Sequence, residues 1–414
     1  MKILLLPPYF FPEKMASSHL DHDRYETFAS HGVLMDLFTP MPTRGVSDKV
    51  RLTYKKRKEE FAYDNMMRVY RFSMYREGRN PFLRALRYVF CFCKQFYFGW
   101  KSKDIDVIYL VSTPPIQGML GAFLKKIKHV PFIYNLQDIF PDSLIGSGLA
   151  KKNGVLWKVG RCIEDFTYRH ADKIIVISED FKENLLAKGV PSDKITIVYN
   201  WVDENRVVPI EEGNNSLYEE LNISRNKFTI VYAGNFGNAQ NIDVIIQTAE
   251  LLKNENDIQF LMFGTGGLVD FYKNIVDEKK LSNVYFYPLQ PADKVSNVYS
   301  LGNLGIVTCK KGLGRGAFPS KTWSIMATGT PVIANYDKDT DLERLVVKNG
   351  LGVFSEADDY HEMAKQILRM YNNKSLCAEY GLNARKYIET NVSKKIATNN
   401  YLKVIKSVVS DLNM

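Results

Sequence analysis

Two successive series of short apolar runs, each run separated from the next by a helix-length stretch, constrain this chain more than any other feature. The first series lies at residues 2–7, 33–38, 107–111, 132–135, 173–177 and 194–198. After a polar, acidic connector at 205–227, the pattern restarts at 228–233, 259–263, 284–287, 304–309 and 330–334. Such alternation is typical of parallel α/β sheets. The sequence therefore predicts an α/β protein with two doubly wound, Rossmann-like domains facing a central cleft.

The chain length is compatible with two domains, because 414 residues exceed what one ordinary core holds. We predict an N-terminal domain at 1–205, a linker at 206–227 and a C-terminal domain at 228–390. A closing amphipathic helix at 391–414 is expected to pack back across the domains.

Cysteine usage and the lack of an apparent targeting segment favour a cytoplasmic protein. The five cysteines are scattered and lack metal-site spacing, which favours reduced thiols. The sequence starts without a recognisable secretory signal. The longest charge-free run, 107–124, contains prolines and polar residues and does not qualify as a membrane span. We expect the chain to stay on the side of the membrane where it is made.

The formal net charge of +9 is concentrated in one window, because residues 51–103 carry 14 Lys and Arg against 4 Asp and Glu. The same window holds the aromatic residues Tyr88, Phe90, Phe92, Phe96, Tyr97, Phe98 and Trp100. This combination suits a surface that lies on anionic lipid. An ordinary core helix with a solvated basic rim and a nucleic-acid patch are the alternatives. We favour membrane contact and expect no nucleic-acid partner.

Two glycine turns follow predicted strands of the second half. Gly234, Asn235 and Gly237 lie directly after the run at 228–233, and Gly264, Thr265 and Gly266 follow the run at 259–263. Glycine lets a backbone approach a ligand closely, and a helix that follows presents free N–H groups. A diphosphate is the expected guest, whereas a purely structural turn is the alternative.

A third element carries a lysine in an unusual position. Lys321 follows Pro319 and Ser320 and falls in the first turn of a predicted helix at 320–328. A cation is locally unfavourable there because the helix dipole is positive at this end. A bound phosphate would remove the conflict, and Arg315 in the preceding glycine-rich loop is expected to hold the same anion. Plain surface charge is the alternative for both residues.

At this point the chain resembles glycosyltransferase family 4, whose members are retaining enzymes of the GT-B fold. The resemblance covers nearly the whole length. It rests on the ordered segments GNFG at 234–237, FLMFGTGG at 260–267, MATGTPVIA at 326–334, NGLGV at 349–353, YGLNAR at 380–385, YFFPE at 9–13, STPP at 112–115, DIFP at 138–141, the stretch 171–179 and YNWVD at 199–203.

The resemblance implies a UDP-sugar donor held by the C-terminal domain and an acceptor held by the N-terminal domain. The branch that builds bacterial capsule, O-antigen or lipopolysaccharide is the most similar. Several of its members move N-acetylated amino sugars to polyprenyl-diphosphate-linked saccharides, which implies a peripheral enzyme on the inner face of the cytoplasmic membrane. The implied donor-binding set is Gly234, Asn235, Gly237, Gly264, Thr265, Gly266, Leu289, Pro319, Ser320, Lys321 and Glu343.

The sequence departs from the family pattern at the donor site. Asn235 and Gln240 are uncharged where many members have Arg and Lys, and the paired glutamates would fall on Gly316 and Ser324. The PSK segment is common in the surface-polysaccharide branch and makes Lys321 the replacement cation. Glu343 is a candidate for the ribose, with a structural salt-bridge role as the alternative.

The resemblance implies front-face attack, in which the leaving diphosphate takes the acceptor proton. Such chemistry needs charge stabilisation and positioning and no dedicated nucleophile. We assign stabilisation to Lys321, Arg315 and the amides of 234–237. Asp138 is expected to position the sugar or handle a proton, with a turn aspartate as the alternative.

The first loop supplies further candidates, because we expect Glu13, Ser17 and Ser18 to contact the donor phosphate or the acceptor. We expect no metal or other cofactor. The Asp104–Asp106 pair precedes a predicted strand, whereas a metal-binding DxD would follow one. A sugar-nucleotide epimerase of the same architecture and a silent nucleotide-sugar-binding scaffold remain alternative functions.

Overall fold

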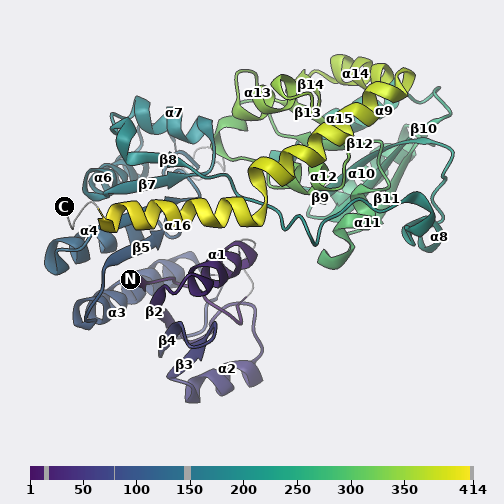
Figure 1. The fold of residues 1–414 in the computed structure, drawn as a ribbon. Coiled ribbons are helices and arrows are strands. Elements are labelled where there is room, and N and C mark those ends of the chain that lie inside the picture. The colour runs from purple at the N-terminus through teal and green to yellow at the C-terminus, as the bar shows by residue number, and fades with distance from the viewer. Residues whose placement is uncertain (14–17, 79, 144–150, 411–414) are drawn as a thin grey trace. The chain divides into compact units, whose positions relative to one another are not determined.

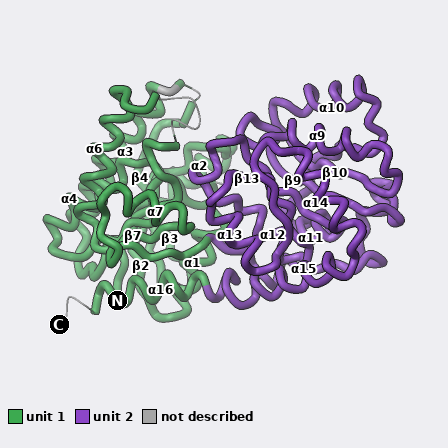
Figure 2. Tube along the Cα trace, turned by 90° about the horizontal axis from the view of Figure 1, so that it is seen from above, with its two compact units in different colours: residues 1–199, 397–414 green, residues 200–396 purple. Residues whose placement is uncertain are grey.

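The computed structural model describes residues 1–13, 18–78, 80–143 and 151–410. The chain forms two compact units, one of residues 1–199 with 397–414 and one of residues 200–396 (Figure 2). Residues 206–227, which the sequence suggested as a linker, belong to the second unit. They contain η2 (Glu212–Asn214) and α8 (Leu217–Glu220), and Leu217 and Tyr218 are buried. Buried apolar side chains of this kind make the segment part of the folded unit.

Unit 1 is built on one sheet with the strand order β3-β4-β2-β1-β5-β6-β7-β8 over the described residues (Figure 1). All neighbours pair in parallel except β3, which is antiparallel to β4. The strands are β1 (Lys2–Leu5), β2 (Leu34–Pro40), β3 (Glu59–Ala62), β4 (Met67–Phe72), β5 (Val107–Val111), β6 (Phe132–Leu136), β7 (Lys173–Val176) and β8 (Ile195–Ile197). The helices are α1 (Ser18–Ser30), α2 (Asp48–Lys56), α3 (Pro81–Lys101), α4 (Gln117–Lys128), α6 (Val155–His170), α7 (Glu179–Ala187) and α16 (Lys394–Ser410), which begins in unit 2.

Unit 2 is an all-parallel sheet with the order β11-β10-β9-β12-β13-β14. Its strands are β9 (Phe228–Asn235), β10 (Ile258–Thr265), β11 (Val284–Pro288), β12 (Leu304–Thr308), β13 (Val332–Tyr336) and β14 (Gly352–Glu356). Its longer helices are α9 (Ile242–Leu251), α10 (Val269–Glu278), α11 (Val295–Tyr299), α12 (Lys321–Ala327), α13 (Asp341–Lys348), α14 (Tyr360–Asn372) and α15 (Lys374–Tyr387). Both sheets confirm the predicted doubly wound α/β architecture.

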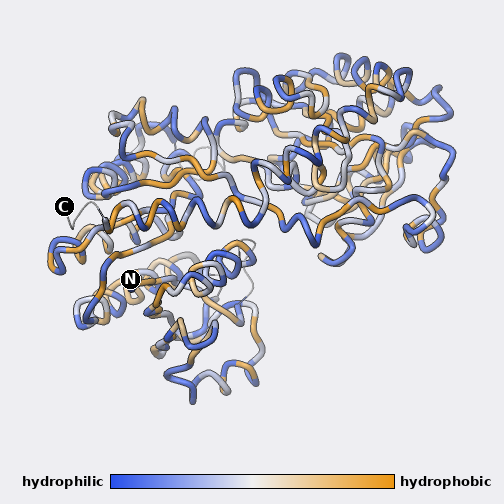
Figure 3. The backbone as a smooth tube through the Cα atoms, viewed as in Figure 1, coloured by the Kyte–Doolittle hydropathy of each residue, from blue (hydrophilic) through white to orange (hydrophobic). Residues whose placement is uncertain are grey.

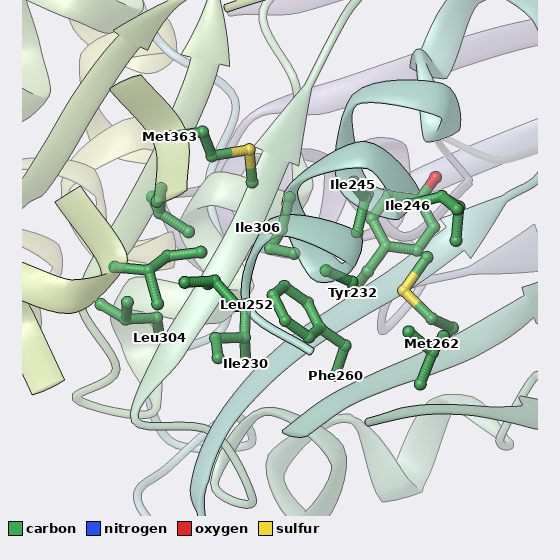
Figure 4. Close-up of a cluster of buried hydrophobic side chains, with 14 of the residues drawn as sticks. Ile230, Tyr232, Ile245, Ile246, Leu252, Phe260, Met262, Leu304, Ile306 and Met363 are labelled. Carbon is green, nitrogen blue, oxygen red and sulfur yellow. The ribbon is translucent and has the colours of Figure 1, made fainter. Parts of the chain in front are cut away.

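Each unit has its own apolar core between sheet and helices. In unit 2 the strand residues Ile230, Phe260 and Ile306 pack against α9 and α14 (Figure 4). Hydrophobic residues follow the strands, whereas the outer helices alternate hydrophobic and hydrophilic positions (Figure 3). Burial of this apolar surface, worth about 25 cal/mol per Å², holds each sheet against its helices.

The window at 51–103 is more structured than its composition indicated. It contains most of α2, the β3–β4 hairpin and α3. The hairpin was missed because its short strands mix charged and apolar residues. Among its aromatic residues, Phe92, Phe96 and Phe98 pack against the unit 1 core. The expectation that this whole set faces a membrane is therefore wrong for these three.

Part of the closing helix α16 packs on unit 1. Tyr401 is buried, and its hydroxyl donates a hydrogen bond to Asn135 Oδ1 at 3.2 Å. The predicted amphipathic character explains this contact, because the apolar face of the helix includes Leu402 and Ile405.

Candidate active site

The unit 2 sheet reverses its winding direction between β9 and β12. Ligands of open α/β sheets bind at this switch point, beyond the carboxyl ends of the strands. The loops after β9 and β12 are joined there, because the Lys310 amide donates to the Ala239 carbonyl and the Thr308 hydroxyl donates to the Gln240 carbonyl. The predicted Gly234 turn and the predicted Lys321 helix belong to these two crossovers, so the sheet order brings them to the same place.

Lys321 and the Gly234 turn are in direct proximity. A Cβ atom on Gly234 would lie 2.8 Å from Lys321 Nζ, so the ammonium group could not keep this position beside a larger residue. The ammonium lies 4.0 Å from the centre of the Tyr232 ring. The Lys321 side chain is half-buried overall, but its Nζ atom is fully buried. Among the described residues, none accepts a hydrogen bond from this Nζ.

This environment changes the charge of the lysine. Burial lowers the pKa of Lys321 from 10.5 to about 7. A buried cation is normally paired, and the Tyr232 ring face compensates only part of the lost hydration. An anion bound beside Gly234 would restore the charged form, because an opposite charge nearby raises the pKa of an amine.

The two glycine turns interlock. Gly234 pairs with Gly264 and Asn235 with Thr265 across the parallel β9–β10 ladder. A Cβ atom on Gly264 would lie 2.0 Å from the Gly234 carbonyl oxygen. The Phe236 amide donates to the Thr265 carbonyl at 2.7 Å. The structure thus brings both turns together. We expected all the amides of 234–237 to be available to a ligand, but the Phe236 amide already donates its hydrogen bond within the protein.

Gly237 precedes the short turn η3 (Asn238–Gln240), which separates the glycine turn from α9. The sequence predicted a helix at 241–253 after this turn, and α9 confirms it. The side chain of Asn235 is exposed and lies beside that of Gln240, at an Nδ2–Oε1 distance of 3.5 Å. The two positions where relatives carry cations are therefore occupied by two adjacent, neutral amides.

Arg315 and Glu343 both contact the backbone of Asp339. Arg315 Nη2 donates to the Asp339 carbonyl at 2.5 Å, and Glu343 Oε2 accepts from the Asp339 amide at 2.5 Å. Glu343 lies in the first turn of α13 behind the N-cap Thr340. Glu343 therefore accepts a hydrogen bond from a backbone amide near that cap. This contact differs from the structural salt bridge that we considered as an alternative role for Glu343.

Three other predicted donor residues lie on loops at the same sheet edge. Pro319 and Ser320 immediately precede α12, and the Pro319 carbonyl accepts from the Thr322 amide. Leu289 follows β11 and is 52% exposed. Sequence reasoning missed Asp337, whose carboxylate accepts from the Gly312 and Gly314 amides and so fixes the loop that carries Arg315. Nothing local in the sequence marks Asp337, because its partners are 23 and 25 residues away.

In unit 1 the predicted residues have different environments. Asp138 follows β6 and is exposed as a residue. Desolvation of its carboxyl raises the pKa of Asp138, and a hydrogen bond with Ser143 opposes this rise. Glu13 is buried, and its Oε1 accepts from the Thr43 and Arg44 amides at 2.7 and 2.8 Å. Glu13 thus ties the first loop to the segment after β2, which explains its burial better than ligand contact does.

The two serines of the first loop are only partly described. Ser18 is the first residue of α1. Ser17 lies outside the described residues.

The switch point of unit 1, between β1 and β5, contains a small pocket of about 120 Å³ that sequence reasoning missed. Its wall includes the rings of Tyr9, Tyr25 and Tyr109 and the polar groups of Asp21 and Gln137. The Tyr109 hydroxyl is buried, and no described residue forms a hydrogen bond with it. Aromatic faces beside a carboxylate and an amide suit a polyhydroxylated ring. Among the site residues predicted from the sequence, Asp138 directly follows Gln137, which lines this pocket.

Candidate metal ligands have other contacts. Asp106 of the Asp104–Asp106 pair accepts a hydrogen bond from the Lys2 amide at 2.7 Å. Across the described residues, no group of three or more His, Cys, Asp or Glu side chains is arranged to hold a metal ion. Among the same residues, no helix has both the length and the apolarity to span a bilayer.

Both halves of the chain match known sequence families. Residues 25–201 match the family described as glycosyl transferase 4-like domain, and residues 215–387 match glycosyl transferases group 1. The chain belongs to glycosyltransferase family 4. Its two parallel-sheet domains are those of the GT-B fold of this family.

Several glycosyltransferases are similar over most of their length. The probable glycosyltransferase WbjE of Pseudomonas aeruginosa is 23% identical over 82% of this chain and 84% of its own. The putative colanic acid biosynthesis glycosyl transferase WcaI of Escherichia coli K12 is 24% identical over 98% of this chain and 100% of its own. The crystal structure of Anabaena HepE in complex with UDP has a TM-score of 0.72 at 17% identity, covering 98% of this chain and 100% of HepE. This family 4 member is thus a glycosyltransferase of bacterial polysaccharide biosynthesis.

Proposed function

We propose that this glycosyltransferase moves an N-acetylated amino sugar from UDP to a lipid-linked saccharide with retention of anomeric configuration. The observation that carries the donor assignment is the buried ammonium of Lys321, which has no hydrogen-bond acceptor among the described residues and lies against a glycine turn. A nucleoside diphosphate supplies the missing anion at that position. The UDP bound in the HepE crystal structure supports the same assignment.

The chemistry follows from charge and position. The bond from the anomeric carbon to the diphosphate breaks while the acceptor oxygen attacks from the same face, and the leaving phosphate takes the acceptor proton. Lys321 stabilises the charge that develops on the leaving group, so the step needs no metal. Asp138 positions the transferred sugar. Arg315 and Glu343 hold the Asp339 loop, in accordance with their shared contact.

We assign the acceptor to unit 1. The pocket at the β1–β5 switch point offers aromatic walls and polar groups for a saccharide ring. Helix α3 presents exposed apolar side chains, including Phe82, Val89 and Trp100, on a basic segment. Such a helix binds the interface of an anionic membrane. We therefore propose a peripheral enzyme on the cytoplasmic face of the membrane, where UDP-sugars and lipid-linked acceptors meet.

One assay tests the transfer. The protein is incubated with a panel of UDP-sugars, with and without a saccharide linked to a polyprenyl diphosphate, and UDP release and the anomeric configuration of the product are measured. Acceptor-dependent UDP release with a retained configuration is the expected result. An altered donor sugar without transfer identifies an epimerase, and tight UDP binding without turnover on any acceptor identifies a scaffold. Either of these results overturns the proposal.

A further inference from the structure

Unit 1 contains a second pocket of about 590 Å³, formed between α2, the end of β4 and α3. It is separate from the pocket at the switch point, because the two share no lining residue. This pocket was not expected, since α2 and the β3–β4 hairpin were not predicted. Its lining residues are Met41, Asp48, Arg51, Leu52, Lys55, Ser73, Met74, Tyr75 and Phe90.

Four large apolar side chains line this α2–α3 groove, those of Met41, Leu52, Met74 and Phe90. Met41 and Met74 are buried, whereas Leu52 and Phe90 are 62% and 41% exposed. Leu52 is the exposed large apolar residue of a helix whose other exposed positions are mostly charged or polar. An exposed leucine facing methionines and a phenylalanine ring forms a flexible apolar trough, because methionine side chains adapt to the shape of a guest.

The rim of the groove is cationic. Arg51 Nη2 donates to the Met74 carbonyl at 2.5 Å, which holds the guanidinium at the edge of the trough. Lys55 lies one helical turn further along α2, on the same face. The single acidic residue of the lining, Asp48, forms an ion pair with Arg76 at 3.1 Å. The rim therefore attracts a negatively charged headgroup.

The groove opens onto the apolar stripe of α3. Phe90 belongs to both, and Leu83, Leu86 and Val89 continue the exposed stripe along the helix. These residues recur at intervals of three to four, so they lie on one face of α3. A molecule in the groove would thus remain in contact with the same surface that we assign to the membrane.

We propose that the α2–α3 groove binds the lipid end of the acceptor, with the first part of the polyprenyl chain in the trough and the diphosphate against Arg51 and Lys55. This inference rests on the proposed function. An apolar chain joined directly to an anionic group has the two chemical features that the groove combines. A folded protein partner would need a wider apolar surface than a trough of this size offers.

The test compares two acceptors that carry the same saccharide, one linked to a polyprenyl diphosphate and one ending in a methyl group. The variant Leu52→Glu/Lys55→Glu adds two negative charges and removes one positive charge at the groove. We expect the ratio of kcat/KM for the lipid-linked acceptor to that for the methyl acceptor to fall at least tenfold. The matched control Leu382→Glu/Lys273→Glu changes an exposed leucine and an exposed lysine in unit 2 and should leave the ratio unchanged. An unchanged ratio in the groove variant overturns the proposal.

A binding measurement separates failure of this inference from failure of the proposed function. Fluorescent farnesyl diphosphate is titrated into the full-length protein, which requires no turnover. We expect saturable binding that the groove variant weakens at least tenfold while UDP affinity stays constant. Displacement of the probe by phosphatidylglycerol as efficiently as by unlabelled farnesyl diphosphate would mean that the groove serves bulk lipid, which contradicts the acceptor assignment.

Discussion

The ammonium of Lys321 lies 4.0 Å above the centre of the Tyr232 ring and against the backbone of Gly234. Tyr232 and Gly234 belong to β9, whereas Lys321 belongs to α12 in the crossover after β12, and the sheet order places β9 beside β12 at the switch point. The aromatic face gives the cation some stabilisation, which is smaller than that of a hydrogen-bonded anion. The free protein therefore holds a lysine whose full charge depends on its ligand.

Removing the amine should separate donor binding from protein stability. We expect Lys321→Met to lower kcat/KM about 100- to 1,000-fold, since one stabilising group is lost in the transition state. The same change should raise the melting temperature of the free protein, because a poorly solvated amine is replaced by an apolar chain of similar length. Kinetics and thermal unfolding without ligand measure the two effects. Wild-type turnover in this variant would contradict the role of Lys321.

UDP affinity should depend on pH with a defined sign. Below pH 7 Lys321 is charged before UDP binds, whereas above pH 7 binding must take up a proton because the pKa of Lys321 is about 7. We expect the dissociation constant of UDP to rise by up to about tenfold per pH unit above 7, until the pKa of the complex is reached. Calorimetry in buffers of different ionisation enthalpy should detect the proton uptake. A pH-independent affinity between pH 7 and 9 would exclude this linkage.

The stability of the free protein should change in the same pH range. Between pH 7 and 10.5 the unfolded chain keeps a proton on Lys321 that the folded chain has released. The free energy of unfolding from this residue therefore rises as pH increases through that window and is lowest below pH 7. Denaturant titrations of wild type and Lys321→Met isolate the contribution. Identical pH slopes in the two proteins would show that the lysine has no depressed pKa.

The interlocked glycine turns allow a matched pair of substitutions. Gly264→Ala would place a Cβ atom 2.0 Å from the Gly234 carbonyl, whereas a Cβ atom on Gly267 meets nothing within 4 Å. We expect Gly264→Ala to cost about 2–3 kcal/mol of stability and to weaken UDP binding, because the turn must shift. Gly267→Ala should retain stability and UDP affinity close to wild type. Equal behaviour of the two variants in denaturant titrations would refute the close-packed turn.

Asp138 offers a test on the acceptor side. Asp138→Asn keeps the shape of the side chain and removes its charge, and we expect kcat to fall by up to about 100-fold if the transferred sugar loses its position. The affinity for UDP should not change, because the assigned UDP contacts lie in unit 2. Single-turnover kinetics and UDP titration measure the two quantities. Loss of UDP affinity together with kcat would point to misfolding.

Membrane contact should depend on salt and on the exposed face of α3. We expect co-sedimentation with phosphatidylglycerol vesicles that weakens as salt rises, because exposed charges are screened within about 10 Å at 0.1 M ionic strength. Trp100→Ser removes a side chain that is 53% exposed and should reduce the bound fraction. Phe271→Ser, at an equally exposed position in unit 2, is the control. Failure to bind at every salt concentration would reject the membrane assignment.

The sequence by itself determined the alternation of strands and helices, the two glycine turns and the position of Lys321 after a strand. These features are local, because strand and helix periodicity and glycine turns depend on neighbouring residues. Prediction of the short β3 and β4 strands failed for the same reason, since β4 is stabilised by pairing with β2 and β3 by pairing with β4, and not by their own composition.

Only the tertiary structure decided which charged groups lose water and which side chains meet. Burial of the Lys321 ammonium requires Tyr232 and Gly234 from strand β9. The carboxylate of buried Glu13 also depends on the amides of Thr43 and Arg44. The α2–α3 groove likewise depends on packing between segments distant in sequence. Desolvation is a property of all the atoms around a group, and the sequence order does not specify those neighbours.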